Sequence, residues 1–223
     1  MDRQTLFNII NFLYRHLTRT EFCGLENVPP TGGIILATNH MSRVDVPLLF
    51  ITPSRKDVNA LVADKYLKRP FFRIILNAAN VIWLDREKAD FAALRTAREY
   101  IQNGGAIGIA PEGTRSKTGS LIEGKAGTVL LAHRAGCPII PVGVTGTESA
   151  IKQLFTFRRP KLVVRYGKPF YLPPISQAER SLWLSKCTDE IMCQIAALLP
   201  ESYRGVYKNH PRLKEILKSN SKK

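Results

Sequence analysis

Apolar residues fall into short continuous runs that alternate with longer segments in which they recur every three or four positions. Short runs of this kind are typical of buried strands, and the periodic segments are typical of helices. The runs predict strands over 34–38, 58–63, 80–84, 106–110, 139–144 and 162–166. The periodic segments predict helices over 46–51, 67–76, 88–102, 124–135 and 177–199.

This alternation predicts an α/β fold with a mostly parallel or mixed central sheet flanked by helices. No long linker, composition break or internal repeat divides the pattern, so we expect one domain. We assign residues 1–20 to an N-terminal amphipathic helix, 21–200 to the domain itself and 201–223 to a basic C-terminal tail.

The N-terminal segment has two interpretations. Its apolar residues recur at helical spacing between basic flanks, without the order of a signal peptide, and no run is long enough to span a bilayer. The helix either docks on the domain or lies in a membrane interface with its basic residues near lipid headgroups. Periodicity alone does not separate the two. The apolar set is Leu6, Phe7, Ile9, Ile10, Phe12, Leu13 and Leu17.

Net charge narrows the class of partner. The 223 residues include 33 Lys and Arg against 18 Asp and Glu, which gives a formal charge of +15. Such an excess indicates an anionic partner, which could be nucleic acid, an anionic membrane surface or a phosphorylated substrate. The four cysteines lack the spacing of a zinc site, and we interpret them as reduced, buried thiols in the cytosol.

Polar residues with catalytic potential follow the first predicted strand directly. His40 lies in the expected loop, and Asp45 lies at the expected start of the next helix, near Pro47. If the chain breaks there, Asp45 can hold one imidazole nitrogen of His40 and leave the other free to take a proton. The alternative is structural, because Ser42 and Asp45 also have the spacing of a capping box. The pair alone leaves both interpretations open.

Two further polar clusters follow predicted strands. Residues 111–116, Pro-Glu-Gly-Thr-Arg-Ser, combine a carboxylate, a flexible glycine and a guanidinium that suits a phosphate, although a simple polar turn fits equally well. Residues 81–86 end in Asp85 and Arg86, and a lone surface cation is the alternative for Arg86. Because sites in α/β sheets form where strands end, the repetition favours one shared site. The Walker, GxGxxG and HExxH motifs do not occur.

Taken together, the clusters resemble the glycerolipid acyltransferases, the family of 1-acylglycerol-3-phosphate acyltransferase. The first matching block, NHMSRVD, is similar to the family's NHxxxxD signature, and VIWLDR and PEGTRS resemble its second and third blocks. Ile140-Pro141-Val142 resembles the fourth block. The blocks occur in family order and cover roughly residues 25–170, which makes the pattern far more specific than any one of them.

The resemblance implies roles for individual residues. His40 is expected to be the catalytic base and Asp45 its partner, with Arg86 in the acceptor site. The third block is expected to contribute to that site through Glu112, Gly113, Thr114 and Arg115. Lys65 is a looser match, because the family often has a lysine before the Pro-Phe-Phe found at 70–72. Asn80 departs from the family, which commonly has glycine near the start of the second block.

The resemblance also implies an enzyme of phospholipid biosynthesis. We expect it to transfer a fatty acyl group from acyl-CoA or acyl-carrier protein to the sn-2 hydroxyl of lysophosphatidic acid, forming phosphatidic acid, without a metal or cofactor. The expected location is peripheral, on the cytoplasmic face of an anionic membrane, which favours the interfacial interpretation of residues 1–20. Glycerol 3-phosphate or another lysophospholipid is an alternative acceptor. A basic nucleic-acid-binding protein is a weaker alternative, because no nucleic-acid-binding motif occurs.

Overall fold

The computed structural model describes residues 1–85, 90–175 and 179–220, and within them the chain folds around one seven-stranded sheet. The order across the sheet is β1-β7-β6-β2-β5-β3-β4. β7 runs antiparallel to β6 and parallel to β1, and the other neighbours are parallel. The strands are β1 (Arg19–Cys23), β2 (Ile34–Thr38), β3 (Asn59–Ala63), β4 (Ile82–Leu84), β5 (Ala106–Ile109), β6 (Ile139–Thr145) and β7 (Lys161–Tyr166).

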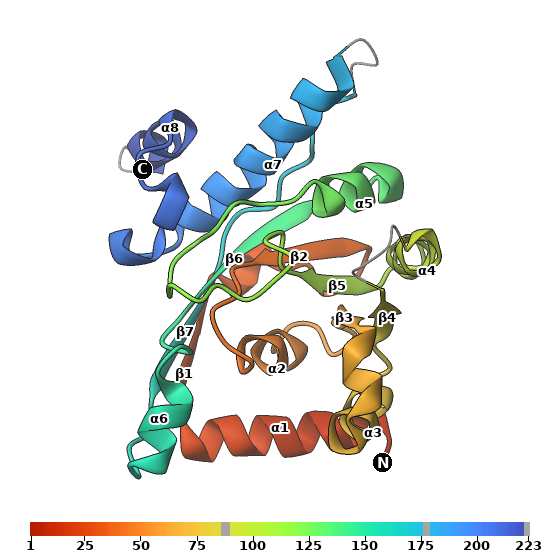
Figure 1. Ribbon diagram of the computed structural model, residues 1–223, viewed down its shortest axis with the longest axis vertical. Coiled ribbons are helices and arrows are strands. Elements are labelled where there is room, and N and C mark those ends of the chain that lie inside the picture. Colours follow the sequence, from red (N-terminus) through yellow and green to blue (C-terminus); the bar gives the residue numbers. More distant parts are fainter. Residues whose placement is uncertain (86–89, 176–178, 221–223) are drawn as a thin grey trace.

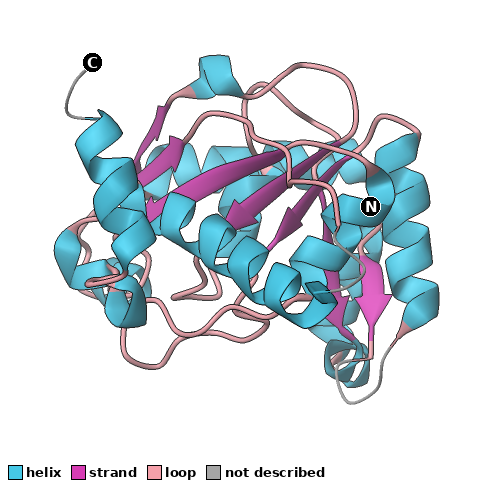
Figure 2. Cartoon of the chain, turned by 90° about the horizontal axis from the view of Figure 1, so that it is seen from above, coloured by secondary structure: helices cyan, strands magenta, loops and turns pink. Residues whose placement is uncertain are grey.

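Helices cover both faces of the sheet and form two separate apolar layers (Figure 1). One face packs against α1 (Arg3–Leu17), α2 (Asp45–Phe50) and α3 (Pro70–Ala78). The other packs against α4 (Phe91–Gln102), α5 (Gly127–Ala135) and α7 (Arg180–Ala197), with α8 (Pro211–Asn220) against α7. The short helix α6 (Ala150–Phe155) connects β6 to β7 at the edge of the sheet. Figure 2 shows the strands fanned out across the sheet between these helices.

The predicted fold class is confirmed, and each of the six predicted strands is present. β1 was not predicted because its residues alternate between exposed and half-buried at the sheet edge, where pairing with β7 supplies the order. The predicted strand over 80–84 begins only at Ile82, because Asn80 takes a left-handed conformation with φ +56°. Asparagine tolerates this conformation better than most residues, so it can stand where the family commonly has glycine.

The segment after residue 200 is packed rather than trailing as far as residue 220. Leu213 and Ile216 of α8 are buried in the same apolar layer as Ile191 and Ile195 of α7. Arg212, Lys214 and Lys218 are exposed on this helix, which belongs to the core. No helix within the described residues has the length and apolar content needed to cross a bilayer.

The sheet divides near the edge formed by β3 and β4. β3 pairs with β5 only at Asn59 and Ala60, and from Leu61 to Ala63 it pairs with β4 alone. β3 and β4 thus diverge from β5 toward their carboxyl ends. Since the carboxyl ends of the parallel strands lie at one edge, the opening is on the side where the predicted site residues lie.

Arg55 hydrogen-bonds to loops at the amino ends of the strands, opposite the predicted site. Its side chain is almost fully buried, and it donates two hydrogen bonds to the Asp57 carboxylate at 2.7 and 2.6 Å. Its remaining donors reach the carbonyl oxygens of Pro29, Gly32 and Gly104. One guanidinium thereby satisfies three backbone carbonyls from turns that are distant in sequence, which few side chains other than arginine can do.

We predict that Arg55→Ala lowers the free energy of unfolding by about 3–5 kcal/mol, because three carbonyls and a carboxylate lose their donor. Urea unfolding measures the loss. Lys56→Ala removes an exposed cation from the next position and should change stability by less than about 0.5 kcal/mol. A similar small loss in both variants would contradict this role for Arg55.

Candidate active site

Asn39 directly follows β2 and brings the next residue out of the sheet. Its buried amide donates to the carbonyl oxygen of Val144 at 2.8 Å and accepts from the Val144 N–H at 2.7 Å. The side chain therefore replaces one backbone pair of the β2–β6 ladder. The main chain is free to turn away at this point, and His40 projects from the carboxyl edge of the sheet.

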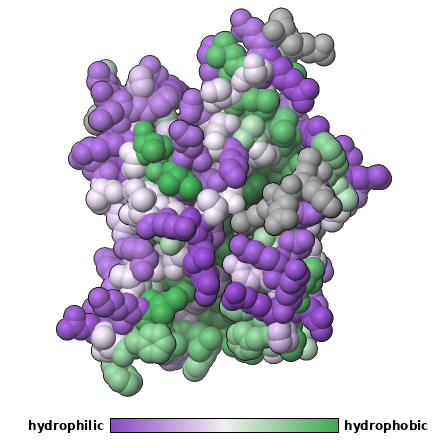
Figure 3. All heavy atoms as spheres, in the orientation of Figure 1, coloured by the Kyte–Doolittle hydropathy of each residue, from purple (hydrophilic) through white to green (hydrophobic). Residues whose placement is uncertain are grey.

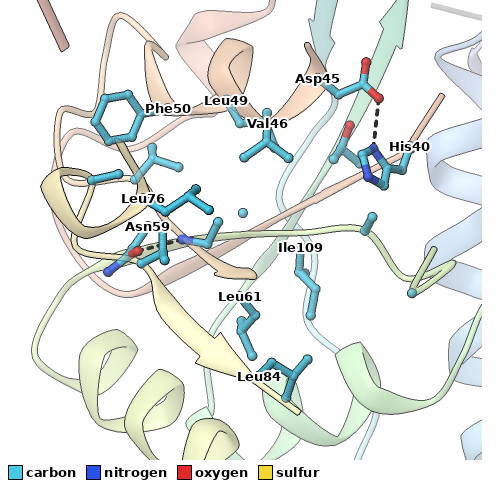
Figure 4. Close-up of a pocket in the computed structure, with 18 of the residues that line it drawn as sticks. His40, Asp45, Val46, Leu49, Phe50, Asn59, Leu61, Leu76, Leu84 and Ile109 are labelled. Atoms are coloured by element: carbon cyan, nitrogen blue, oxygen red, sulfur yellow. Dashed lines mark hydrogen bonds and ion pairs between the residues drawn. The ribbon is translucent and has the colours of Figure 1, made fainter. Parts of the chain in front are cut away.

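His40 and Asp45 are in contact, as the sequence analysis anticipated. Imidazole Nδ1 lies 3.0 Å from Asp45 Oδ2, and both residues line the same cavity (Figure 4). The same carboxylate oxygen accepts the N–H groups of Met41 and Ser42, each at 2.7 Å. The Asp45 side chain is 1% exposed and that of His40 is 16% exposed. Val44 is the N-cap of α2 and has no side-chain cap bond, so Asp45 does not complete the capping box that its spacing from Ser42 allowed. Its carboxylate instead holds the loop before α2 and the His40 ring.

Glu112 joins the second cluster to the first through the backbone. Its Oε1 accepts the His40 N–H at 2.8 Å, and its Oε2 accepts the Ile122 N–H at 3.0 Å. The Ser116 N–H donates to the His40 carbonyl oxygen at 2.8 Å, so the main chain of His40 is held on both sides. Burial raises the pKa of Glu112 to about 7, against the opposing effect of the two N–H donors.

A largely apolar cavity of about 430 Å³ extends from His40 into the opening between β5 and β3. Figure 4 shows Leu61, Leu84 and Ile109 along its walls and Phe50 and Leu76 farther from the imidazole. Gly108 lines it as well, where an added Cβ would lie 3.2 Å from Leu49 Cδ1. Leu6 and Ile10 of α1 also contribute to the lining.

The other predicted site residues lie in different settings. Gly113 lines the cavity and has φ +67°, which favours glycine, whereas Thr114 and Arg115 are exposed on the same loop. Lys65 is exposed on the 3-10 helix η2 (Asp64–Lys68), outside the set of described residues that line the cavity. Arg86 lies outside the described residues.

Lys125 lines the cavity and is not among the site residues predicted from the sequence. Its side chain passes over Gly113, where an added Cβ would lie 3.2 Å from Lys125 Cδ. Gly127 and Thr128, the first residues of α5, line the cavity beside it. A lysine next to a helix N-terminus makes this wall attractive to an anion. The lysine between two glycines at 124–127 was the available sequence signal.

α1 contacts the loop between β2 and α2 that carries His40, called the catalytic loop below. The Tyr14 hydroxyl donates to the carbonyl oxygen of Val44 at 2.7 Å, one residue before Asp45. Burial, together with the negative charge of Asp45, raises the pKa of Tyr14. The phenol therefore stays protonated and keeps its donor for the loop at physiological pH.

This arrangement suits proton transfer by an imidazole. Asp45 occupies Nδ1 of His40 and leaves Nε2 as the nitrogen available to a hydroxyl group in the cavity. Within the described residues, no cluster of His, Cys, Asp and Glu could hold a metal ion. The cavity thus combines an imidazole, a largely apolar wall and a lysine beside a helix N-terminus.

A family model described as Acyltransferase matches residues 19–145. A 1-acyl-sn-glycerol-3-phosphate acyltransferase of Borreliella burgdorferi is 32% identical over 56% of this chain and 51% of its own length. The Bacillus subtilis protein of the same name is 24% identical over 78% of this chain and 84% of its own length. The chain spans about half the length of the Borreliella relative.

A solved structure has a similar fold. The crystal structure of the 1-acyl-sn-glycerophosphate (LPA) acyltransferase PlsC from Thermotoga maritima matches with a TM-score of 0.64 and 26% sequence identity. The match covers 85% of this chain and 79% of the other. The structural match therefore covers more of the chain than residues 19–145, which the family model matches.

We predict a pH dependence of stability that depends on Glu112. Because its pKa rises from 4.5 to about 7 on folding, the folded state holds a proton that the unfolded state has lost within that window. The resulting stability is fully present below pH 4.5 and is lost as the pH rises through about 7, by up to about 1.4 kcal/mol per unit. Urea unfolding between pH 4 and 8, roughly the window set by these pKa values, measures the slope. Glu112→Gln should lack this component, and parallel curves for the two proteins would refute it.

Proposed function

The chain belongs to the acyltransferase family, and we propose that it transfers a fatty acyl group from a thioester donor to the sn-2 hydroxyl of a 1-acylglycerol 3-phosphate. The product is phosphatidic acid, which places the enzyme in phospholipid biosynthesis. The observation that carries the proposal is the His40–Asp45 pair at the mouth of a long apolar cavity.

The proposed reaction begins with His40 as general base. Nε2 takes the proton of the acceptor hydroxyl as its oxygen attacks the thioester carbonyl, and Asp45 stabilises the imidazolium that forms. When the tetrahedral intermediate collapses, the carbon–sulfur bond breaks and the imidazolium returns the proton to the leaving thiolate. An acyl-enzyme is unnecessary, because the thioester is already activated and His40 serves both half-steps.

The apolar cavity supports the choice of a fatty acyl group. Its walls are built mainly from aliphatic and aromatic side chains, and its volume of about 430 Å³ lies within the range of ligand pockets. The imidazole lies at one end, so an acyl chain in the cavity would present its carbonyl carbon to the attacking oxygen. Acyl-CoA and acyl-carrier protein both supply such a chain, and we propose this donor class without choosing between them.

Two cations, Lys125 and Arg115, support a phosphorylated acceptor. Lys125 lines the cavity next to the N-terminus of α5, and Arg115 is exposed on the loop whose Glu112 holds His40. We propose that both cations bind the acceptor phosphate and so position its hydroxyl beside Nε2. Glycerol 3-phosphate and other lysophospholipids carry the same phosphate and remain alternative acceptors.

The two sides of α1 support a peripheral location at an anionic membrane. Leu6 is buried against the domain and Tyr14 contacts the catalytic loop, whereas Ile9, Phe12 and Leu13 are exposed on the outer side. Docking on the domain and lying in the interface are thus compatible for this helix. We propose that the outer side enters the headgroup region. The cytoplasmic face stays a prediction.

We predict that His40→Ala lowers the rate of acyl transfer by about 10²–10⁴-fold, because the general base is lost. Turnover of labelled acyl-CoA with lysophosphatidic acid measures the effect, and thermal unfolding checks the fold. His133→Ala is the matched control, since His133 is exposed on α5 outside the cavity. Near-normal turnover in His40→Ala would overturn the proposed mechanism.

We predict that Lys125→Ala and Arg115→Ala each raise KM for the acceptor about tenfold or more, because each removes a charge-assisted hydrogen bond to the phosphate. KM for the donor should change little. Lys117→Ala removes an exposed cation from the same loop and serves as the control. An effect on the donor KM alone would contradict the assignment.

A further inference from the structure

Large exposed apolar side chains gather along one edge of the molecule. Figure 1 places α1, α3 and α6 together at this edge, and Figure 3 shows hydrophobic atoms gathered there in the same orientation. Phe155 at the end of α6 is 83% exposed, and Phe157 in the following turn is 100% exposed. We call the set the docking face: Ile9, Phe12, Leu13, Leu17, Phe71, Ile74, Ile151, Phe155 and Phe157.

Hydrogen bonds fix the three segments of the docking face relative to one another. Arg159, which follows the turn after α6, donates to the carbonyl oxygens of Arg15 and Thr18 at 2.9 and 2.8 Å, at the end of α1. At the start of α1, the Arg3 guanidinium donates to the carbonyl oxygen of Ala79, just after α3. α1 is thereby tied to one neighbour at each end, and the face is a single preorganised surface.

Phe157 has a backbone conformation that is unfavourable for a bulky residue. Its φ is +54°, in the left-handed region where a bulky side chain is strained. The turn ends α6 with a bond from the Arg158 N–H to the Gln153 carbonyl oxygen at 2.9 Å, a geometry in which glycine usually occupies the left-handed position. A fully exposed phenylalanine here gains no packing within the chain. Strain combined with complete exposure points to a role outside the fold.

The charge around the docking face selects its partner. α1, α3 and residues 150–160 contain no Asp or Glu, and they carry Arg3, Arg15, Arg73, Lys152, Arg158 and Arg159. A basic rim around apolar side chains suits an anionic bilayer, which accepts both. A second copy of the same face would bring like charges together, which disfavours self-association.

We propose that the turn after α6 inserts Phe155 and Phe157 into the surface of an anionic phospholipid bilayer, as a second contact beside α1. The inference rests on the proposed function, which draws its acceptor from a membrane. Two neighbouring contacts on one rigid face hold the domain in one orientation. α1 lines the cavity with Leu6 and Ile10 on its inner side, so that orientation also sets how the cavity meets the lipid.

Flotation of the full chain with vesicles of phosphatidylcholine and phosphatidylglycerol tests the proposal. The variant F155S/F157S should bind the vesicles with an apparent affinity lower by about tenfold or more. The reason is that two apolar side chains are no longer transferred from water into the bilayer. Phe91→Ser is the matched control, since Phe91 is 67% exposed at the start of α4, away from the docking face, and its variant should float like the unaltered chain. Equal flotation of the double variant and the unaltered chain would overturn the proposal.

Phe157→Gly separates docking from folding. It removes the strained side chain, so Tm should be equal or higher while vesicle binding weakens. A lower Tm with unchanged binding would show that Phe157 serves the fold and would overturn the proposal. Gel filtration assigns the face to a second copy instead if F155S/F157S alters the oligomeric state but floats normally. Acyl transfer is measured separately, so absent turnover with normal flotation would remove the proposed function and leave the docking result standing.

Discussion

One oxygen of Asp45 organises both the local fold and the chemistry of the site. Oδ2 accepts hydrogen bonds from the His40 ring and from two backbone N–H groups that precede α2. A buried carboxylate is costly unless donors surround it, and the chain supplies them to Oδ2 by turning sharply after β2. The other oxygen, Oδ1, is buried and has no hydrogen-bond partner among the described residues. The turn that places donors on Oδ2 also aligns the imidazole. Holding the loop before α2 and positioning the His40 ring therefore depend on the same oxygen, and a substitution at Asp45 affects both.

The apolar cavity depends on the division of the sheet rather than on a separate domain. After Ala60, β3 follows β4 and leaves β5 without a neighbour on that side, so side chains from both faces of the sheet reach the opening. Gly108 adds no side chain at the point where the strands separate. An apolar hollow thus leads from the carboxyl edge, where His40 projects, into the layer packed by α1, α2 and α3. The geometry suits a long substrate whose reactive end stays near the edge.

The sequence predicted local relations well and long-range ones poorly. His40 and Asp45 lie five residues apart, so the predicted break between strand and helix made their contact possible, and the family resemblance implied it. Glu112 was expected in the acceptor site, but its two oxygens are occupied by backbone N–H groups from residues 40 and 122, which no linear pattern reveals. Lys125 was not predicted for the same reason: its position over Gly113 depends on how the segment between β5 and α5 folds back. Arg86, whose role came only from the family resemblance, lies outside the described residues.

α1 connects the docking face to the loop that carries His40. Its inner side places Leu6 and Ile10 in the cavity wall and the Tyr14 hydroxyl on the Val44 carbonyl, while its outer side exposes Ile9, Phe12 and Leu13. A helix held this firmly cannot shift at the interface without moving the residue next to Asp45. The proposed contact with lipid and the proposed positioning of His40 are therefore mechanically related, although different residues serve them. If both proposals hold, changes on the outer side act on access to a lipid acceptor, and changes on the inner side act on the reaction itself.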